Sequence, residues 1–259
     1  MTNSRSRAGL WAACLPAFAL FAAQTLPAQD NEIHILCSNG FHAAFEKLLP
    51  QAEHAAGHPV KVRFGTSASF KQAIEGGEQF DLVIVTPQIV DDLIKEGKIA
   101  AGTKVDLASS GIGIGVRAGQ PKPDVSSAQA IKQTLLQAKS IGIVKVGAGT
   151  PTVLDMLKNL GISENVQPKI VFQPGADQSM KDLAGGQVAI AFGLISEIQP
   201  APGVQLVGPL PAEFQRKIVL SAGIASAAKN RDAANAIIKS FTSAKAEAAI
   251  KAAGMDPVR

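Results

Sequence analysis

Three short loops contain most of the residues that could bind a ligand. They are residues 37–40 (Cys-Ser-Asn-Gly), 65–69 (Gly-Thr-Ser-Ala-Ser) and 147–152 (Gly-Ala-Gly-Thr-Pro-Thr). Each loop falls between the end of a predicted strand and the start of a predicted helix, which leaves backbone N–H groups free at the positive end of the helix dipole. Serine and threonine at such places also cap helices without binding any ligand. Three loops of this kind in one chain nevertheless favour a shared site for an anion.

One histidine close to the first loop has the chemistry of a proton carrier. His42 follows Gly40 by two positions, where an imidazole could act as a general base on a bound ligand. The alternative is an ordinary exposed helix residue. The sequence also contains six cations that could reach such a ligand, and it does not rank them: Arg63, Lys71, Arg117, Lys122, Lys139 and Lys145.

Two other motifs predict no function. Gly111, Gly113 and Gly115 alternate within a predicted strand, so they lack the turn into a helix that a dinucleotide-binding fingerprint requires. His54 and His58 have the spacing of two metal ligands but lie in a predicted surface turn without a carboxylate or thiol cluster. We therefore expect no metal site and no cofactor.

Composition narrows the class of protein. The chain has 259 residues, no Tyr, one Trp and a formal charge of +4. The small charge and the scattered Lys and Arg residues argue against a nucleic-acid partner. Apart from Trp11, the chain lacks the Trp and Tyr rings on which sugars usually stack, so a carbohydrate site is not expected.

The first residues of the chain predict where in the cell the protein is located. Residues 1–28 combine a basic beginning, a short apolar run and a small-residue end, which together indicate a secretory signal peptide and a periplasmic protein. After residue 28, Cys37 is the single cysteine, so no intrachain disulfide is expected. Cys37 itself is predicted to be a small buried hydrophobic residue at a strand end.

Short β-rich runs alternate with helical patterns along the chain. This alternation predicts an α/β fold with parallel sheets that helices cover on both faces. The predicted strands are residues 33–36, 60–64, 82–85, 112–116, 140–146, 169–172, 188–192 and 218–224. The predicted helices are residues 41–49, 70–75, 87–94, 128–138, 151–160, 177–184, 231–241 and 244–253. Pro50 is expected to kink or end the first helix, and Ser67 or Ser69 to cap the second.

Several motifs together resemble a known family. They include residues 38–40 (Ser-Asn-Gly), 64–69 (Phe-Gly-Thr-Ser-Ala-Ser), 80–84 (Phe-Asp-Leu-Val-Ile) and 196–198 (Ser-Glu-Ile). On these motifs the chain resembles type II periplasmic solute-binding proteins, in particular the molybdate-binding-protein-like group. The resemblance implies two α/β lobes with a ligand cleft between them, joined by two crossing strands near residues 109–116 and 216–224. Lobe one would comprise residues 29–110 and 220–259, and lobe two residues 111–219.

The resemblance also implies where the ligand binds. Molybdate binders use a serine in the first loop, a serine in the second and a tyrosine. Ser67 matches the second serine, whereas the first falls on Gly40 and the tyrosine near Phe192. The loss of two donors favours an organic carboxylate over molybdate. The predicted ligand-binding residues are Ser38, Asn39, Gly40, Thr66, Ser67, Gly149, Thr150 and Phe192.

Two functions are compatible with this resemblance. The first is a periplasmic solute-binding protein, expected to be a monomer, that captures a small anion and delivers it to an ABC importer in the membrane. The second is an isomerase, because the same group resembles periplasmic aconitate isomerases, which move a proton between allylic carbons of trans- and cis-aconitate. His42 is the candidate catalytic base for the second function.

Overall fold

The computed structural model describes Met1 and residues 32–258, so apart from Met1 the predicted signal peptide lies outside the described residues. The strands are β1 (Ile33–Ser38), β2 (Val60–Gly65), β3 (Leu82–Val85), β4 (Val105–Arg117), β5 (Ile141–Val144), β6 (Ile170–Gln173), β7 (Ile190–Leu194), β8 (Val204–Pro209), β9 (Lys217–Ile224) and β10 (Asp256–Pro257). The α-helices are α1 (His42–Ala56), α2 (Ser67–Glu75), α3 (Pro87–Lys95), α4 (Ala128–Gln137), α5 (Thr150–Asn159), α6 (Ser163–Val166), α7 (Ala176–Gly185), α8 (Ile195–Ile198), α9 (Arg231–Phe241) and α10 (Ala244–Ala252). Two 3₁₀ helices, η1 (Asn39–Phe41) and η2 (Gln167–Lys169), complete the fold. In this part of the chain we find no helix with the length and apolarity that crossing a membrane requires.

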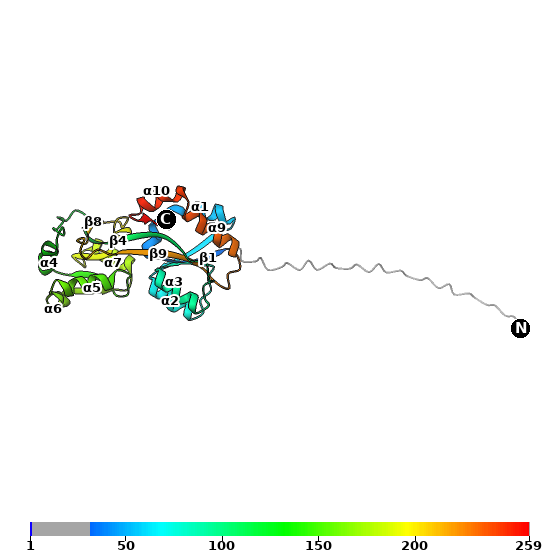
Figure 1. The fold of residues 1–259 in the computed structure, drawn as a ribbon, viewed down its shortest axis with the longest axis horizontal. Coiled ribbons are helices and arrows are strands. Elements are labelled where there is room, and N and C mark those ends of the chain that lie inside the picture. The colour runs from blue at the N-terminus through cyan, green and yellow to red at the C-terminus, as the bar shows by residue number, and fades with distance from the viewer. Residues whose placement is uncertain (2–31, 259) are drawn as a thin grey trace. The chain divides into compact units, whose positions relative to one another are not determined.

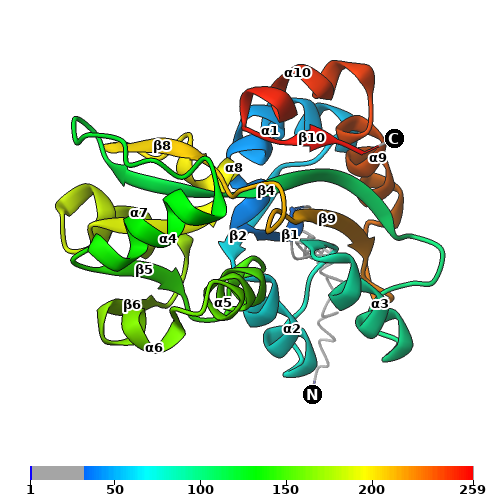
Figure 2. The same cartoon turned by 60° about the vertical axis from the view of Figure 1, so that its left-hand side comes forward.

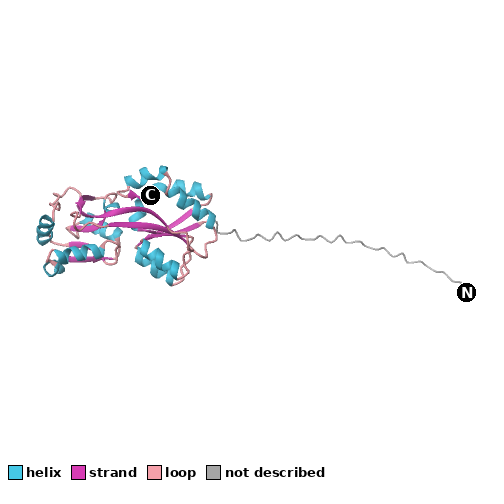
Figure 3. Ribbon diagram, viewed as in Figure 1, coloured by secondary structure: helices cyan, strands magenta, loops and turns pink. Residues whose placement is uncertain are grey.

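The strands follow the order β2-β1-β3-β9-β4-β7-β5-β6, with β8 and β10 paired to β4. The long strand β4 lies in the middle of this path and extends through both parts of the sheet, as Figures 1 and 3 show. Its residues 105–111 pair with β9, whereas its residues 112–117 pair with β7 and β8. We call β1, β2, β3, β9 and residues 105–111 the first half-sheet, and residues 112–117 with β5, β6, β7 and β8 the second half-sheet.

Parallel pairing, which the alternation predicts throughout, holds only in the outer parts of the path. β1 is parallel to β2 and β3, and β5 is parallel to β6 and β7. In the middle, β9 is antiparallel to β3, and β4 is antiparallel to β9 and β7. The prediction of parallel sheets is wrong there because β4 takes the chain out of the first half-sheet and β9 returns it, so the two run in opposite directions.

Helices cover both faces of the first half-sheet, as predicted. One face packs against α1, α9 and α10, where the rings of Phe45 and Phe241 meet edge to face with centroids 5.5 Å apart. Cys37 is buried in the same cluster, in agreement with its predicted role. The other face packs against α2 and α3 around Phe70 and Leu93. Figures 1 and 2 show these two groups of helices on opposite sides of β1 and β9.

The second half-sheet has its own cores. The larger one joins residues of β4, β5 and β7 to α4, α5 and α6, with Ile131, Met156 and Val166 buried. A smaller one packs Met180 and Leu183 of α7 against α8. Each half-sheet therefore buries its apolar side chains against helices of its own.

A buried carboxylate fixes three segments of the first half-sheet. Asp81 precedes β3, and its two side-chain oxygens accept backbone N–H groups of His34 (3.0 Å) and Lys229 (3.2 Å). The backbone carbonyl of Asp81 accepts the N–H of Ala225 at 2.9 Å. One side chain thus connects β1, the start of β3 and the turn that leads into α9.

Most of the longer predicted elements agree with the structure, whereas the short elements α6, α8 and β10 were not predicted. The sequence does not predict β8, and it starts β4 at residue 112 although the strand begins at Val105. Pro50 neither ends nor interrupts α1, which continues to Ala56. That helix ends instead where Gly57 takes a left-handed conformation with φ of 66°, which glycine adopts without strain.

Candidate functional site

The loops predicted to bind an anion meet around one small cavity. The first turns of α2 and α5 reach it from the two half-sheets, and Figure 2 shows these helices next to each other. The cavity volume is about 40 Å³, roughly three times the 10–15 Å³ that one water molecule needs. It is therefore larger than the site of a single water molecule. Its polar lining comes from Ser38, Asn39, Thr66, Ser67, Thr150 and Glu197.

The α2 side of the cavity presents a pair of hydroxyl groups. The oxygen of Ser67 accepts the backbone N–H of Thr86 at 3.3 Å, and its hydroxyl donates to Ser38 at 3.2 Å. The hydroxyl hydrogen of Ser38 remains available for a ligand. Thr66, and not Ser67 or Ser69 as predicted, caps α2 by accepting the N–H of Ser69 at 3.0 Å. Because Thr66 caps the helix, the hydroxyl of Ser67 is not used as a cap and can contact a ligand in the cavity.

The α5 side contributes backbone groups more than side chains. The hydroxyl of Thr150 donates to the carbonyl of Val144 at 2.5 Å, and its backbone N–H donates to Gly147 at 3.1 Å. Both donors of Thr150 are thus used inside the loop. Among the hydrogen bonds of residues 32–258, none uses the N–H groups of Ala148 and Gly149. These two N–H groups lie at the start of α5, which is the positive end of its helix dipole, and both residues line the cavity.

Asn39 offers an unsatisfied polar atom at the same place. Its side chain is buried, and its Oδ1 has no hydrogen-bond partner within the described structure. A buried amide oxygen without a partner costs about 1–3 kcal/mol, and a ligand that bonds to it would recover that cost. A carboxylate ligand only accepts hydrogen bonds, so it would bond to the NH2 end of the Asn39 amide, whereas a ligand hydroxyl could donate to the Oδ1 end.

All the predicted ligand-binding residues line the cavity except Gly40. Gly40 lies at a close approach of the two half-sheets, where a Cβ atom would be 2.6 Å from Cδ1 of Leu194 and 3.1 Å from Cδ1 of Leu220. Its carbonyl accepts the hydroxyl of Ser196 at 2.8 Å. Gly40 therefore allows close contact of the two half-sheets. Its neighbours Ser38 and Asn39 line the cavity in its place.

His42, the predicted catalytic base, lies outside the cavity. Its ring stacks on Phe64 with centroids 3.7 Å apart, and its Nε2 is 3.1 Å from Oε1 of Glu46. It lines a neighbouring groove of about 650 Å³, which meets the cavity at Asn39, Ala176 and Glu197.

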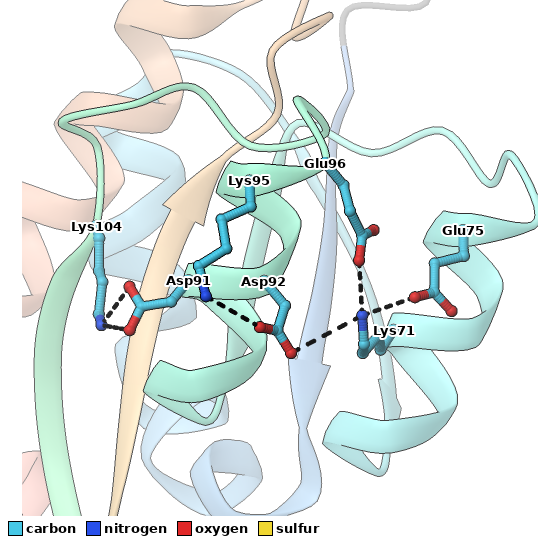
Figure 4. A network of polar contacts seen from close by, with 7 residues as sticks. All are labelled: Lys71, Glu75, Asp91, Asp92, Lys95, Glu96 and Lys104. Carbon is cyan, nitrogen blue, oxygen red and sulfur yellow. Dashed lines mark hydrogen bonds and ion pairs between the residues drawn. The ribbon is translucent and has the colours of Figure 1, made fainter.

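None of the six candidate cations is among the residues that line the cavity. Figure 4 shows Lys71 held between α2 and α3, with its Nζ 2.6 Å from Glu75 and 2.9 Å from Glu96. These hydrogen bonds raise the pKa of Lys71 above its ordinary value. Arg63 pairs with Glu78 and lies 4.8 Å above the ring of Phe70. Both side chains stabilise the α2 surface, and none of the described residues that line the cavity is a lysine, arginine or histidine.

Glu197 is the residue of the cavity that the sequence reasoning missed. It is partly buried, and its Oε2 accepts the backbone N–H of Leu194 at 2.9 Å. Burial raises the pKa of Glu197 to about 7, and the carboxylate of Asp177 adds to this rise, against the opposing effect of the Leu194 hydrogen bond. The spacing of Leu194 and Glu197 is that of a capping box, but leucine is not a capping residue and α8 has only one turn. The signal in the sequence is the Ser-Glu-Ile motif at residues 196–198, which supports the family resemblance but assigns no role to Glu197.

Comparisons with known proteins show the family and the fold of the chain. Residues 33–256 match the family described as bacterial extracellular solute-binding protein. The chain is 29% identical over 256 residues to an aconitate isomerase from a Pseudomonas species, a match that covers 96% of this chain and 95% of that protein. It is 24% identical over 234 residues to the molybdate-binding protein ModA of Azotobacter vinelandii, covering 88% of this chain and 90% of that protein.

Solved structures show the same fold. The periplasmic molybdate-binding protein of Azotobacter vinelandii superposes with a TM-score of 0.75 at 21% identity, covering 88% of this chain and 100% of that chain. The sulfate-binding protein SubI of Mycobacterium tuberculosis gives a TM-score of 0.69 at 18% identity, covering 88% and 87%. The mixed α/β fold is therefore that of type II periplasmic binding proteins.

Proposed function

The chain belongs to the bacterial extracellular solute-binding protein family, and from this membership we propose that it captures a small organic carboxylate between two lobes. Lobe one would comprise residues 29–110 and 220–259, and lobe two residues 111–219. β4 and β9 would be the crossing strands between them, and the lobes would close on the ligand by a hinge motion.

The observation that supports a carboxylate is the kind of donor around the cavity. The Ser67 hydroxyl lies at the start of α2, bonded to that of Ser38 at the end of β1, and the free N–H groups of Ala148 and Gly149 lie before α5. Two groups of neutral donors on opposite walls suit two planar carboxylates of one molecule. The lining offers no hydroxyl at Phe192, where molybdate binders have a tyrosine, so a tetrahedral oxyanion would lack a donor there.

A ligand screen by isothermal titration calorimetry tests this proposal. The panel comprises trans-aconitate, citrate and succinate as carboxylates, with molybdate and sulfate as tetrahedral anions of similar charge. We expect binding of at least one carboxylate and an increase in melting temperature with its concentration, since a ligand that binds only the folded state stabilises it. Tight binding of molybdate with no binding of any carboxylate would refute the proposal.

Delivery to a membrane importer completes the proposed role. The family is associated with ABC transporters, and we propose that the closed, ligand-bound monomer hands its carboxylate to such a complex. Pull-down of a cognate importer by the protein in the presence of ligand, with loss of capture when the ligand is omitted, is the expected result.

A second candidate function is supported by the relatives. The aconitate isomerase of a Pseudomonas species matches nearly the whole of this chain, and an allylic isomerisation needs what this cavity offers, namely donors for carboxylates beside an ionisable group. Incubation of the protein with trans-aconitate, followed by ¹H NMR, is the test. We expect cis-aconitate to form, and its absence at high protein concentration and long incubation would exclude this function.

A further inference from the structure

The described lining of the cavity contains a single ionisable side chain, and it is an acid. Among the described residues that line it, only Glu197 can gain or lose a proton near neutral pH. The other polar groups are hydroxyls, one amide and backbone N–H groups. A carboxylate beside a bound anion weakens binding by repulsion, so ligand capture alone does not explain a glutamate here.

The position of the carboxyl group allows it to exchange protons. Glu197 lines both the small cavity and the larger groove of about 650 Å³. Its Oε2 is fixed by the N–H of Leu194 at 2.9 Å, and no donor within residues 32–258 contacts its Oε1. One oxygen is therefore held in place while the other is available to a ligand, and the groove provides a route for protons to and from solvent.

A capping role does not require this side chain to be charged. α8 is four residues long, and a neutral amide would accept the N–H of Leu194 equally well. The titratable groups around Glu197 form no salt bridge that would stabilise its anion. Asp177 and Lys181 of α7 and His42 and Glu46 of α1 line the groove beside it, and no ion pair joins Glu197 to any described residue.

On the basis of the carboxylate site proposed above, we propose that Glu197 is the acid–base group that moves a proton between two carbons of a bound unsaturated carboxylate. In trans-aconitate, the Glu197 carboxylate would take a proton from the methylene carbon, and the C–H electron pair would form a new double bond to the central carbon. The original double bond would open toward the former vinyl carbon, which receives the proton back from the Glu197 carboxyl. One C–H bond breaks and one forms, so the step needs no oxidant, reductant or other reactant.

The rest of the cavity suits this step. Negative charge spreads onto the ligand carboxylates while the proton is on Glu197, and the hydroxyl pair of Ser38 and Ser67 and the starts of α2 and α5 would stabilise it. A general base works best when its pKa is near the working pH, and burial gives Glu197 a pKa of about 7. Removing the base while leaving these donors intact would separate catalysis from binding.

The experiment compares the full-length mature protein with its Glu197→Gln variant on trans-aconitate. Binding is measured by calorimetry, and both turnover and deuterium incorporation in D₂O are followed by ¹H NMR. We expect Glu197→Gln to bind within a few-fold of the wild type or more tightly, and to lose about 10²–10⁴-fold in kcat. Circular dichroism confirms that the variant is folded.

A second variant distinguishes proton transfer from a structural role. Asp177→Asn removes the neighbouring carboxylate that raises the pKa of Glu197. It should move the acidic limb of the kcat–pH profile to lower pH, while the activity at its plateau remains close to that of the wild type. A structural role for Glu197 would leave the profile unmoved.

Each outcome has a definite meaning. If no carboxylate binds the wild type, the proposed function and this inference both fail. If trans-aconitate or another carboxylate binds but the wild type neither turns over trans-aconitate nor exchanges its protons with D₂O, the inference alone is overturned. It is also overturned if Glu197→Gln keeps kcat within tenfold of the wild type, or if His42→Asn abolishes a turnover that Glu197→Gln retains.

Discussion

Removal of one hydroxyl group tests whether the start of α2 binds the ligand or only forms a helix. The change is Ser67→Ala, at a side chain that is 6% exposed. In the structure its oxygen accepts the N–H of Thr86 at 3.3 Å, and its hydrogen is directed to Ser38 at 3.2 Å. The substitution leaves the N-cap at Thr66 in place, so the helix itself should form as before.

The size of the effect follows from the number of bonds lost. In the complex, the Ser38–Ser67 pair has one hydroxyl hydrogen left for the ligand, and the donation from Ser67 orients Ser38. Loss of a buried donor to a charged acceptor costs about 1–3 kcal/mol, which corresponds to a 5- to 150-fold increase in Kd. The free energy of unfolding without ligand should fall by roughly 1 kcal/mol, because the N–H of Thr86 loses its acceptor.

Calorimetry with the tightest-binding carboxylate of the screen measures this change. The matched control is Ser69→Ala, two residues along α2, where the exposed hydroxyl donates to the carbonyl of Thr66 at 2.8 Å and does not line the cavity. The control should keep Kd within about twofold of the wild type. An unchanged Kd for Ser67→Ala, or an equal loss for both variants, would refute the assignment of Ser67 to the ligand.

Three further predictions concern the stability of the folded chain, and they are made at Gly40, Asp81 and Glu197. Gly40→Ala places a methyl group 2.6 Å from Leu194 and should reduce stability in urea by about 1–3 kcal/mol; Leu194→Val should recover part of this loss, and strictly additive effects would rule out the steric cause. Asp81→Ala leaves two backbone N–H groups without acceptors and should cost about 2–4 kcal/mol, whereas Asp81→Asn keeps one acceptor and should cost less; equal costs would contradict this reading. The folded chain holds the proton of Glu197 more tightly than the unfolded chain between pH 4.5 and about 7, so the stability of the wild type relative to Glu197→Gln should fall as pH rises through that window, by on the order of 2–3 kcal/mol. A stability difference that does not vary with pH would show that the pKa of Glu197 is not raised.

The local pattern of apolar residues was sufficient to predict most of the longer elements of the fold, because a buried strand or helix face consists of apolar residues at regular spacing. Residues 82–85 are four branched apolar residues and form β3, buried on both faces. The first part of β4 was not predictable in this way. Ser109 and Ser110 interrupt the apolar pattern of β4, yet both are buried, and Ser110 donates to the carbonyl of Gly254 at 3.3 Å. A partner 144 residues away leaves no trace in a local window.

In the candidate site too, local sequence patterns were predictable and contacts between residues distant in the sequence were not. Loops between strands and helices are visible in the sequence, and because such loops gather at one edge of a sheet, the residues predicted from them lie around one cavity. Contacts made across the half-sheets were not visible. Gly40 belongs to one of these loops but meets Leu194 of the other half-sheet, and Glu197 reaches the cavity from a one-turn helix that has no periodic pattern.

The absence of Lys, Arg and His from the described lining determines how the charge of this cavity can change. Hydroxyls, an amide and the starts of α2 and α5 attract an anion through partial charges that do not titrate. The cavity can therefore gain or lose one full charge only at Glu197. In its protonated form this side chain becomes a donor toward the ligand, and in its ionised form it repels the ligand carboxylates and accepts a proton. A site that needed only to hold an anion would gain from a fixed cation, whereas a site that must also move a proton needs a group that passes between these two forms at the pH of its surroundings.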